Sequence, residues 1–563
     1  MSKTVAEFML HRLAEEWGVQ RIYGYPGDGI NGFMGAFQEL DGKPEFIQVR
    51  HEVIGAFAAC AHAKFTGEVG VCIATSGPGA VQLLNGLYDA KLDHAPALAI
   101  VGQQQRMSLG SEWLQEVDLH NLFKDVASEF VQTCMAPEQA RHLIDRGMRI
   151  AAASRTVTAI IVPVDVQHAD HEEPERSHGA VFSSAGTVRQ HLAPDDHELR
   201  RAAEILNSGR RVAILAGQGA AGAVDEVTQT ADVLGAGVAK ALNGRAALPD
   251  DLPFVTGSIG LLGTKTSSDM MAKCDTLLMI GTNFPFADWL PEEGQARAVQ
   301  IDIDPRLIGM RYPIEVGLAG DSAATLRALL PLLERKQDRS WREQIEKDVE
   351  RWWRVLGERA MQPAEPINPM RVFHELSPLL PDNCILTADS GTSANWWARH
   401  LVLRSGMKAA LSGTLATMTP AVPYALAAKF AYPDRAVIAA IGDGAMQMMG
   451  INALIDIAHY HPRWPNKQLV VLVLNNGDLN EVTWEQRAMA GDPRFDASQT
   501  LPKFPYAQYA EMLGLKGMRI DDPGDLRGAW EEALAADRPV LLEAITDPNM
   551  PPLPPQIRFE TAR

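Results

Sequence analysis

Residues 436–450 read AVIAAIGDGAMQMMG, an aliphatic run that ends in GDG (442–444) and passes at once into a second apolar stretch. The run is continuous rather than alternating, which is typical of a parallel strand covered on both faces. Taken alone, the triplet indicates only a tight turn. Further along, the apolar run LVVLVL ends in NNGD (475–478). Because neighbouring parallel strands end at the same edge of a sheet, we expect Asp443 and Asn476 to lie close together.

The side chains at these two strand ends are those of a metal site. Oxygens from Asp443 and Asn476, with an oxygen from Asp478, suit Mg²⁺, which completes its octahedron with water and phosphate oxygens. Gly442 and Gly444 let the backbone approach a diphosphate, and the N-terminus of the following helix favours negative charge. The sequence therefore predicts a metal–diphosphate site at this edge.

Apolar strand-like runs alternate with helical patterns along the whole chain. The expected strands cover residues 46–50, 69–75, 97–102, 159–165, 211–217, 276–281, 298–304, 384–389, 436–442, 469–476 and 540–545. Helical patterns lie between them, for example at 53–65 and 198–209. This alternation predicts doubly wound α/β domains with parallel sheets.

Two polar segments divide the chain. Residues 168–186 form an expected linker, and residues 334–369 contain a charged helix followed by a proline-rich connector. We therefore expect three domains and a tail, with the bounds 1–170, 187–335, 365–548 and 549–563.

Composition excludes several classes of protein. The chain of 563 residues has a formal net charge of −18, which argues against nucleic acid as a partner. It contains no apolar run of about 18 residues, and its N-terminus lacks the features of a signal peptide. Five scattered cysteines without a C-x-x-C pair indicate reduced thiols in a cytoplasmic protein without zinc.

A family resemblance rests on the motifs at both ends of the chain. GDG followed downstream by NN resembles the cofactor motif of thiamine diphosphate enzymes. RIYGYPGDGINGFM (21–34), QVRHEVIGAFAACAH (48–62), ATSGPGAVQLLNGLYDA (74–90) and APALAIVGQ (95–103) follow in an order that resembles the pyrimidine-binding domain of the pyruvate oxidase and acetolactate synthase group. The resemblance extends over nearly all of residues 1–170.

Glu52 has two interpretations. By itself it is a charge in the first turn of a helix, where it stabilises the positive end. Under the resemblance it bonds the aminopyrimidine N1′ of the cofactor and favours the imino tautomer, which removes the proton from the thiazolium carbon.

The resemblance also implies the remaining cofactor contacts. Leu415, in SGTLATMTPAVPYALAAKFA (412–431), corresponds to a bulky aliphatic residue that wedges between the two cofactor rings, although helix packing is the plainer interpretation. The other residues expected at thiamine diphosphate are Pro26, Gly27, Pro78, Asn85, Asp389, Gly391, Gly413, Gly442, Gly444 and Ala445. In this family the cofactor lies between two subunits, which implies a homodimer or homotetramer.

The middle of the chain resembles the FAD-binding domain of pyruvate oxidases, most of all the bacterial quinone-linked type. The best matching pieces are GTNFPF (281–286) and QIDIDP (300–305). Without the resemblance, the glycine-rich stretch around 257–263 indicates only a turn into a helix. The residues expected at FAD are Gly217, Gly260, Thr282, Asn283, Phe284, Asp302 and Asp304.

The expected substrate pocket departs from the oxidase pattern. Gln115 stands in LQE (114–116), where the family often has Phe-Gln before the acid. Glu481 stands where related oxidases place an aromatic residue, whereas Val482 and Glu485 match them. A carboxylate beside a 2-oxo acid repels it unless it is protonated or paired.

These observations predict a thiamine diphosphate, Mg²⁺ and FAD enzyme that oxidatively decarboxylates a small 2-oxo acid, with pyruvate as the first choice. The alternative is a non-oxidative decarboxylase or carboligase of the acetolactate synthase type, and a homologue without catalysis is a third interpretation. The quinone-linked oxidases continue into a membrane-binding C-terminal peptide where this chain stops, so we expect no membrane recruitment by that route.

Overall fold

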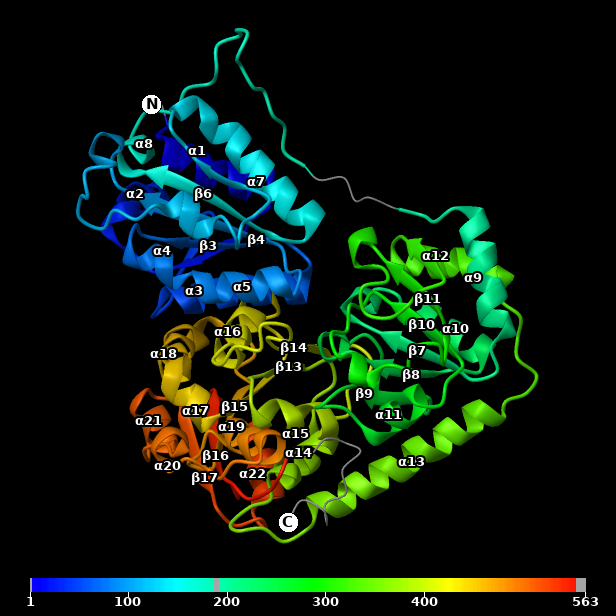
Figure 1. Ribbon diagram of the computed structural model, residues 1–563. Helices are drawn as coiled ribbons and strands as arrows, with labels where there is room; N and C mark the ends of the chain where they lie inside the picture. The colour runs from blue at the N-terminus through cyan, green and yellow to red at the C-terminus, as the bar shows by residue number, and fades with distance from the viewer. Residues whose placement is uncertain (1–2, 187–191, 553–563) are drawn as a thin grey trace. The chain divides into compact units, whose positions relative to one another are not determined.

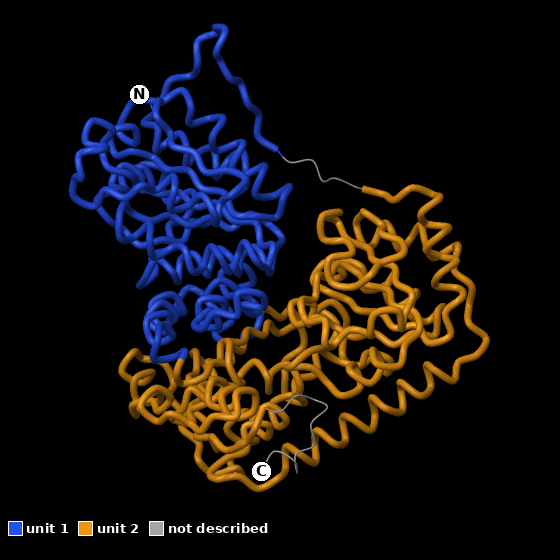
Figure 2. Tube along the Cα trace, in the orientation of Figure 1, with its two compact units in different colours: residues 1–190, 411–437, 445–467 blue, residues 191–410, 438–444, 468–563 orange. Residues whose placement is uncertain are grey.

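The computed structural model describes residues 3–186 and 192–552 of the chain. These residues form two compact units, coloured separately in Figure 2. Unit 1 comprises residues 1–190, 411–437 and 445–467, and unit 2 comprises residues 191–410, 438–444 and 468–563. The expected middle-domain start at 187 and most of the expected tail, 553–563, lie outside the described residues.

The first sheet has six parallel strands and belongs to unit 1 (Figure 1). In chain order its strands are β1 Arg21–Gly24, β2 Glu45–Gln48, β3 Gly70–Ala74, β4 Ala97–Gln103, β5 Val131–Thr133 and β6 Val157–Pro163. The helices of this part of the chain are α1 Val5–His11, α2 Asn31–Glu39, α3 Glu52–Thr66, α4 Pro78–Gln82, α5 Leu84–Leu92, α6 Leu119–Phe123, α7 Ala140–Ser154 and α8 Val164–Gln167.

The second sheet also has six parallel strands and lies in unit 2. Its strands are β7 Val212–Ala216, β8 Gly237–Lys240, β9 Val255–Ser258, β10 Thr276–Ile280, β11 Arg297–Asp302 and β12 Val316–Ala319. Its helices are α9 Asp196–Ser208, α10 Val224–Leu234, α11 Lys265–Met271 and α12 Ser322–Leu329, followed by the charged helix α13 Ser340–Ala360.

The third sheet, again of six strands, is built from the C-terminal part of the chain. Its strands are β13 Ile385–Ala388, β14 Lys408–Ala410, β15 Val437–Gly442, β16 Leu469–Asn475, β17 Lys516–Ile520 and β18 Val540–Ile545. The helices of this part are α14 Pro369–Leu376, α15 Thr392–His400, α16 Ala421–Ala431, α17 Asp443–Ala445, α18 Ile451–Tyr460, α19 Asn480–Glu485, α20 Asp496–Gln499, α21 Tyr506–Met512 and α22 Leu526–Leu534.

The strand orders place a reversal near the middle of the second sheet and near one edge of the first and third sheets, whose last two strands are also exchanged. The first sheet runs β2-β1-β3-β4-β6-β5, and the third runs β14-β13-β15-β16-β18-β17, which is the same order. The second runs β12-β11-β10-β7-β8-β9. The order therefore reverses between β1 and β3, between β10 and β7, and between β13 and β15. Ligands of open α/β sheets bind outside the carboxyl ends of the strands at such points.

Helices from the C-terminal part of the chain complete unit 1. Helix α16 packs along α3, which in turn packs on α5 and β3 (Figure 1). Nearly every residue of α16 is buried, and α3 is buried over most of its length. A helix that is apolar all round needs neighbours on several sides. Residues 421–431 therefore lie in unit 1 because their apolar surface packs against α3.

The predicted fold class is confirmed, and the errors of the prediction concern short strands. Every strand expected from an apolar run forms, as do the helices at 53–65 and 198–209 and the charged helix before the third sheet. Seven strands were not expected: β1, β5, β8, β9, β12, β14 and β17. None exceeds five residues, and β5, β9, β12, β14 and β17 lie at or next to sheet edges, where less apolar cover is needed.

Candidate active site

The loops at the reversal in the first sheet pack closely on one residue, Thr75. Pro26 and Gly27 follow β1, and Thr75 follows β3. The backbone N–H of Gly29 donates to Thr75 Oγ1 at 2.9 Å. A Cβ on Gly27 would lie 2.6 Å from Thr75 Cβ, so the loop after β1 approaches this closely only with glycine at 27.

Glu52 lies beside the same cluster as the first residue of α3. Its neighbour His51 caps the helix by accepting the Val53 N–H at Nδ1 (3.2 Å). Oε1 of Glu52 lies 3.0 Å from the position that a Cβ on Gly79 would take. A side chain at position 79 would crowd the half-buried Glu52 carboxylate, so the observed position of that carboxylate favours glycine there. Residue 79 directly follows the predicted cofactor residue Pro78.

Gln115 lies in the same cluster, although its loop is distant from residues 75–79 in the sequence. Its backbone has φ +61°, and its Cβ lies 2.8 Å from where a Cβ on Gly77 would stand. Ser76 Oγ donates to Gln115 Oε1 at 3.5 Å. Its neighbour Glu116 instead accepts backbone N–H groups of its own loop, including that of Trp113 at 3.0 Å. Gln115, and not Glu116, therefore lies with Glu52, Gly27 and Pro78.

The segment that carries Leu415 also belongs to unit 1. Leu415 is half-buried in a loop between β14 and α16. The side-chain amide of Asn85, on α5, donates to Thr417 Oγ1 at 3.1 Å. The predicted cofactor residues Asn85, Gly413 and Leu415 are thus part of one connected region.

In unit 2, the Asp443 carboxylate organises the edge of the third sheet. Its Oδ2 accepts the backbone N–H of Asn476 at 3.0 Å and of Gly477 at 2.7 Å, and its Oδ1 accepts that of Gly444 at 3.0 Å. Burial raises the pKa of Asp443 to about 6, against the opposing effect of these hydrogen bonds. A buried carboxylate with a raised pKa is one that a bound cation would stabilise.

The neighbouring side chains fit a magnesium–diphosphate group. Asn476 Oδ1 accepts the Asp478 N–H at 3.0 Å, and an amide oxygen has a second lone pair. The Asp478 carboxylate is already engaged by Thr483 (2.9 Å), Asn480 (3.1 Å) and Arg494 (3.2 Å). The main-chain oxygen is therefore the better metal ligand at residue 478. Within the described ranges no group of three or more His, Cys, Asp or Glu residues could hold a metal, and this set has a single carboxylate available.

Open space adjoins this edge. Asp389 follows β13, and Gly391, the N-cap residue before α15, has φ +100°. A Cβ on Gly391 or on Gly442 would meet no atom within 4 Å. The loops after β13 and β15, which flank the strand reversal, thus leave room beside Asp443 for a phosphate group.

Glu481 forms a polar group with α15. Asn395 Nδ2 donates to Glu481 Oε2 at 2.8 Å, whereas Asn395 Oδ1 is buried and unpaired. Burial raises the pKa of Glu481 to about 7, and the charge of Glu485 adds to the effect. Val482 and Glu485 lie on the same short helix, α19, and Val482 is exposed. The buried Arg399 stands one turn after Asn395 and donates from Nε to the Gly263 carbonyl at 3.0 Å.

The residues expected at FAD gather at the reversal in the second sheet. A Cβ on Gly217 would lie 2.5 Å from Thr282 Cβ, and one on Gly260 would lie 3.1 Å from the Phe284 ring. Asn283 Oδ1 accepts from Arg311 Nε at 3.0 Å. The carboxylates follow β11, where Asp302 accepts the Asp304 N–H at 3.0 Å and Asp304 pairs with Arg306 at 2.8 Å. A carboxylate after a strand at such an edge can accept a hydrogen bond from a ribose hydroxyl, but Asp304 is already paired with Arg306, and close packing alone also explains Gly217.

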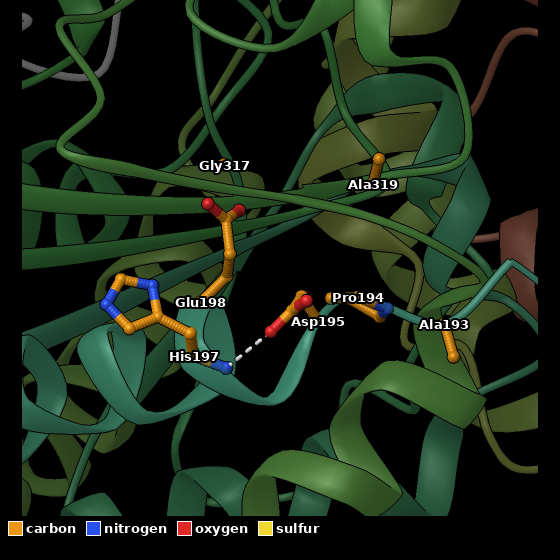
Figure 3. Close-up of a pocket in the computed structure, with 7 residues that line it drawn as sticks. All are labelled: Ala193, Pro194, Asp195, His197, Glu198, Gly317 and Ala319. Atoms are coloured by element: carbon orange, nitrogen blue, oxygen red, sulfur yellow. Dashed lines mark hydrogen bonds between the residues drawn. The ribbon is translucent and has the colours of Figure 1, made fainter.

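A surface pocket elsewhere in unit 2 contains none of these residues (Figure 3). It lies between the start of α9 and the edge strand β12. Asp195 caps α9 there by accepting the His197 N–H at 2.8 Å. The pocket therefore lies beside an ordinarily capped helix N-terminus.

Sequence reasoning did not identify Thr75 or Asn395. Thr75 lies inside the quoted motif ATSGPG, but nothing local indicates that the loop after β1 packs on it. Asn395 carries no motif, and it faces Glu481 only because α15 and α19 follow strands β13 and β16 of one sheet.

Comparisons with known proteins agree with this architecture. Three family models match in order: the N-terminal TPP binding domain of thiamine pyrophosphate enzymes at residues 3–122, the central domain at 199–329, and the C-terminal TPP binding domain at 389–544. The three matches cover most of the three sheets.

Full-length relatives support the same assignment. A putative thiamine pyrophosphate-containing protein, YdaP, of Bacillus subtilis is 35% identical over 562 residues, covering 100% of this chain and 94% of the relative. A pyruvate oxidase of Lactiplantibacillus plantarum is 28% identical, covering 98% and 90%. A probable acetolactate synthase large subunit of Methanococcus aeolicus is 30% identical, covering 97% and 92%.

Three parallel α/β sheets, matched in chain order by the three domains of thiamine pyrophosphate enzymes, define the class of protein. The chain belongs to the thiamine pyrophosphate enzyme family, in the group that includes pyruvate oxidase and acetolactate synthase. No helix in the described part of the chain has the length and apolar character needed to span a bilayer.

Proposed function

We propose that this protein decarboxylates a small 2-oxo acid, pyruvate by first choice, with thiamine diphosphate, Mg²⁺ and FAD, and that it is an oxidoreductase. The observation that carries the proposal is the pair of sheet edges: Glu52 over Gly79 in unit 1, and Asp443 bound to Asn476 and Gly477 in unit 2. These are the groups needed at the two ends of a thiamine diphosphate molecule.

Each edge has a distinct task in this proposal. Asp443, Asn476 and the main-chain oxygen of Asp478 hold Mg²⁺, and Asp389 and Gly391 border the diphosphate. Glu52 holds a proton at the aminopyrimidine. Bound thiamine diphosphate would supply a thiazolium carbon that attacks the 2-oxo group, and bound FAD would accept two electrons.

The residues of the proposed substrate pocket distinguish two candidate functions. Gln115, Glu481, Val482 and Glu485 border the substrate in our proposal. The Asn395–Glu481 pair offers a polar group where the oxidases have an aromatic one, and this favours the second candidate, a carboligase that joins the acyl unit to another carbonyl. The protonated form of Glu481 at pH below 7 would not repel a substrate carboxylate.

Assembly and location follow from the same proposal. A homodimer or homotetramer would bring the unit-1 edge of one subunit to the unit-2 edge of another. All five cysteines are buried and none forms a disulfide, which supports a reducing compartment such as the cytoplasm.

One preparation tests the proposal. We expect purified protein to be yellow, to lose its flavin colour when pyruvate is added without oxygen, and to release CO₂ only with thiamine diphosphate and Mg²⁺. A colourless protein that forms acyloins from pyruvate would establish the carboligase instead. Absence of CO₂ release with pyruvate and with other 2-oxo acids would reject both.

A further inference from the structure

A buried ionic network lies next to residues 411–419, the loop that precedes α16; we call it the Leu415 loop. Lys64, on α3, donates from Nζ to Asp93 Oδ2 at 2.6 Å, to the Leu411 carbonyl at 2.8 Å and to the Tyr424 hydroxyl at 2.6 Å. Tyr424 in turn donates to Asp89. All of these residues belong to unit 1, and the side chains of Lys64, Asp89 and Asp93 are at most 5% exposed.

Asp93 connects this network to the backbone of the Leu415 loop. Its Oδ2 accepts the Gly413 N–H at 3.0 Å, and its Oδ1 accepts the Thr414 N–H at 2.9 Å. These two consecutive N–H groups directly precede Leu415. Hydrogen bonds to an ionised acceptor are about twice as strong as neutral ones. The carboxylate therefore fixes the backbone immediately before the proposed wedge.

The charge on Asp93 is supported by its surroundings. Burial alone would raise the pKa of Asp93, but the Lys64 charge and the hydrogen bonds from Lys64, Thr414 and Gly413 outweigh it and hold the pKa below its ordinary value. Burial raises the pKa of the neighbouring Asp89 instead. Of the two carboxyl groups around Lys64, Asp93 is thus the one that more readily carries the negative charge.

The Leu415 loop has a backbone that needs such support. Ala416 has φ +53° and Thr419 has φ +92°, in the left-handed region that β-branched residues rarely adopt. Strained backbone persists where the surrounding structure holds it, and it concentrates at functional sites. Further contacts come from Asn85 to Thr417 Oγ1 and from the Thr417 N–H to Ser412 Oγ (3.2 Å).

We infer that Asp93, held by Lys64, is a positioning residue that fixes Gly413 and Leu415 in the cofactor site. The inference rests on the proposed function, because Leu415 has a role only if thiamine diphosphate binds there. Asp93 does not touch the cofactor in this scheme, and it acts only through the backbone of residues 413 and 414.

The test uses the full-length variant Asp93→Asn, whose amide keeps the size of the side chain but removes its charge. Hydrogen exchange of the amides in 411–419 is measured without cofactor, and the dissociation constant of thiamine diphosphate with Mg²⁺ is measured by tryptophan fluorescence. We expect exchange at 413 and 414 to accelerate and cofactor binding to weaken, each by roughly 10- to 100-fold, as for the loss of hydrogen bonds to a charged group. The rate at saturating cofactor should fall less than the affinity.

A matched control is Asp125→Asn. Asp125 also pairs with a lysine, Lys91 on α5, at 3.5 Å, but its side chain is 74% exposed, and its other described side-chain partner is Tyr88 rather than a residue of the Leu415 loop. It should behave as wild type in both measurements. If Asp93→Asn does not fold, Tyr424→Phe replaces it, since this change removes one acceptor of Lys64 and keeps the ring; we then expect the same two effects at smaller size.

The outcomes separate the inference from the proposed function. Unchanged exchange at 413 and 414 in a folded variant would overturn the inference, as would faster exchange with unchanged cofactor affinity. Wild-type protein that binds no thiamine diphosphate would instead reject the proposed function, and the exchange data alone would then show whether Asp93 holds the loop.

Discussion

Asn395 donates its side-chain amide to the carboxylate of Glu481 at 2.8 Å, across two helices that follow different strands of the third sheet. The pair lies beside the edge that carries Asp443 and Asn476. Because burial raises the pKa of Glu481 to about 7, its charge changes within the physiological range. In the proposed function, where Glu481 borders the substrate, this contact links the residue at 481 to the pH at which a 2-oxo acid can be used.

The first prediction concerns this pH dependence. With a pKa of about 7, Glu481 is mostly neutral below that pH and ionised above it. In the proposed function the ionised form repels the substrate carboxylate. We expect kcat/KM for pyruvate to fall about tenfold per pH unit above about pH 7, and Glu481→Gln to abolish that decline. Glu485→Gln should move the decline to lower pH, because the Glu485 charge helps to raise the pKa of Glu481. A Glu481→Gln enzyme with the wild-type decline would show that another group titrates.

The second prediction concerns Glu52. Glu52→Gln should slow exchange of the cofactor C2 proton for deuterium by about 10²- to 10⁴-fold, the usual contribution of a positioned acid–base group. The circular dichroism spectrum should stay unchanged, since the residue is half-buried at a helix start. Glu39→Gln, at the exposed end of α2, is the control. Exchange at the wild-type rate in the Glu52 variant would refute its role.

The third prediction concerns the metal edge. Asp443→Ala leaves the N–H groups of Gly444, Asn476 and Gly477 without their common acceptor. We expect the Mg²⁺-dependent affinity for thiamine diphosphate to fall by about 100-fold or more, as for loss of a charged ligand (about 3 kcal/mol). Isothermal titration calorimetry at several Mg²⁺ concentrations measures this. Asp382→Ala, which removes a carboxylate that is 92% exposed, should bind normally. An Asp443 variant with unchanged affinity would place the metal elsewhere.

The fourth prediction concerns stability and pH at Asp456. Asp456, on α18, accepts hydrogen bonds from Arg50 Nε at 3.0 Å and from the Arg50 N–H at 3.2 Å, two residues before Glu52. Burial nevertheless raises the pKa of Asp456 to about 7. The folded state then binds this proton more tightly than the unfolded state, so the contribution of Asp456 to stability is greatest below about pH 4 and decreases as the pH rises to about 7.

Asp456→Asn should reduce that decrease, because an amide does not titrate. The melting temperatures of wild type and variant are measured at pH values of about 5 and about 8. We expect the melting temperature of wild type to change more between these two pH values than that of the variant. If the melting temperature of the variant changes as much as that of wild type, or more, the Arg50 contact keeps the pKa of Asp456 low.

The sequence indicated much of this site because its signals are local. An apolar run followed by GDG, and another followed by NN, place Asp443 and Asn476 at one edge, since parallel strands end together. The same reasoning could not find Thr75, whose hydroxyl binds the Gly29 N–H from another loop. It also left the side chain of Asp478 open as a ligand, whereas Thr483, Asn480 and Arg494 engage it.

Consecutive residues were enough to predict three parallel sheets, the polar residues at their strand ends and the family, because strand periodicity and glycine-rich turns are local features of the sequence. Three contacts became known only from the folded chain: α16 packs along α3, Asp93 accepts the N–H groups of residues 413 and 414, and Asn395 donates to Glu481. Burial of apolar surface is non-directional, so an apolar helix face does not by itself specify which helix it packs against. Contacts between residues far apart in the sequence therefore become visible only once the helices are packed.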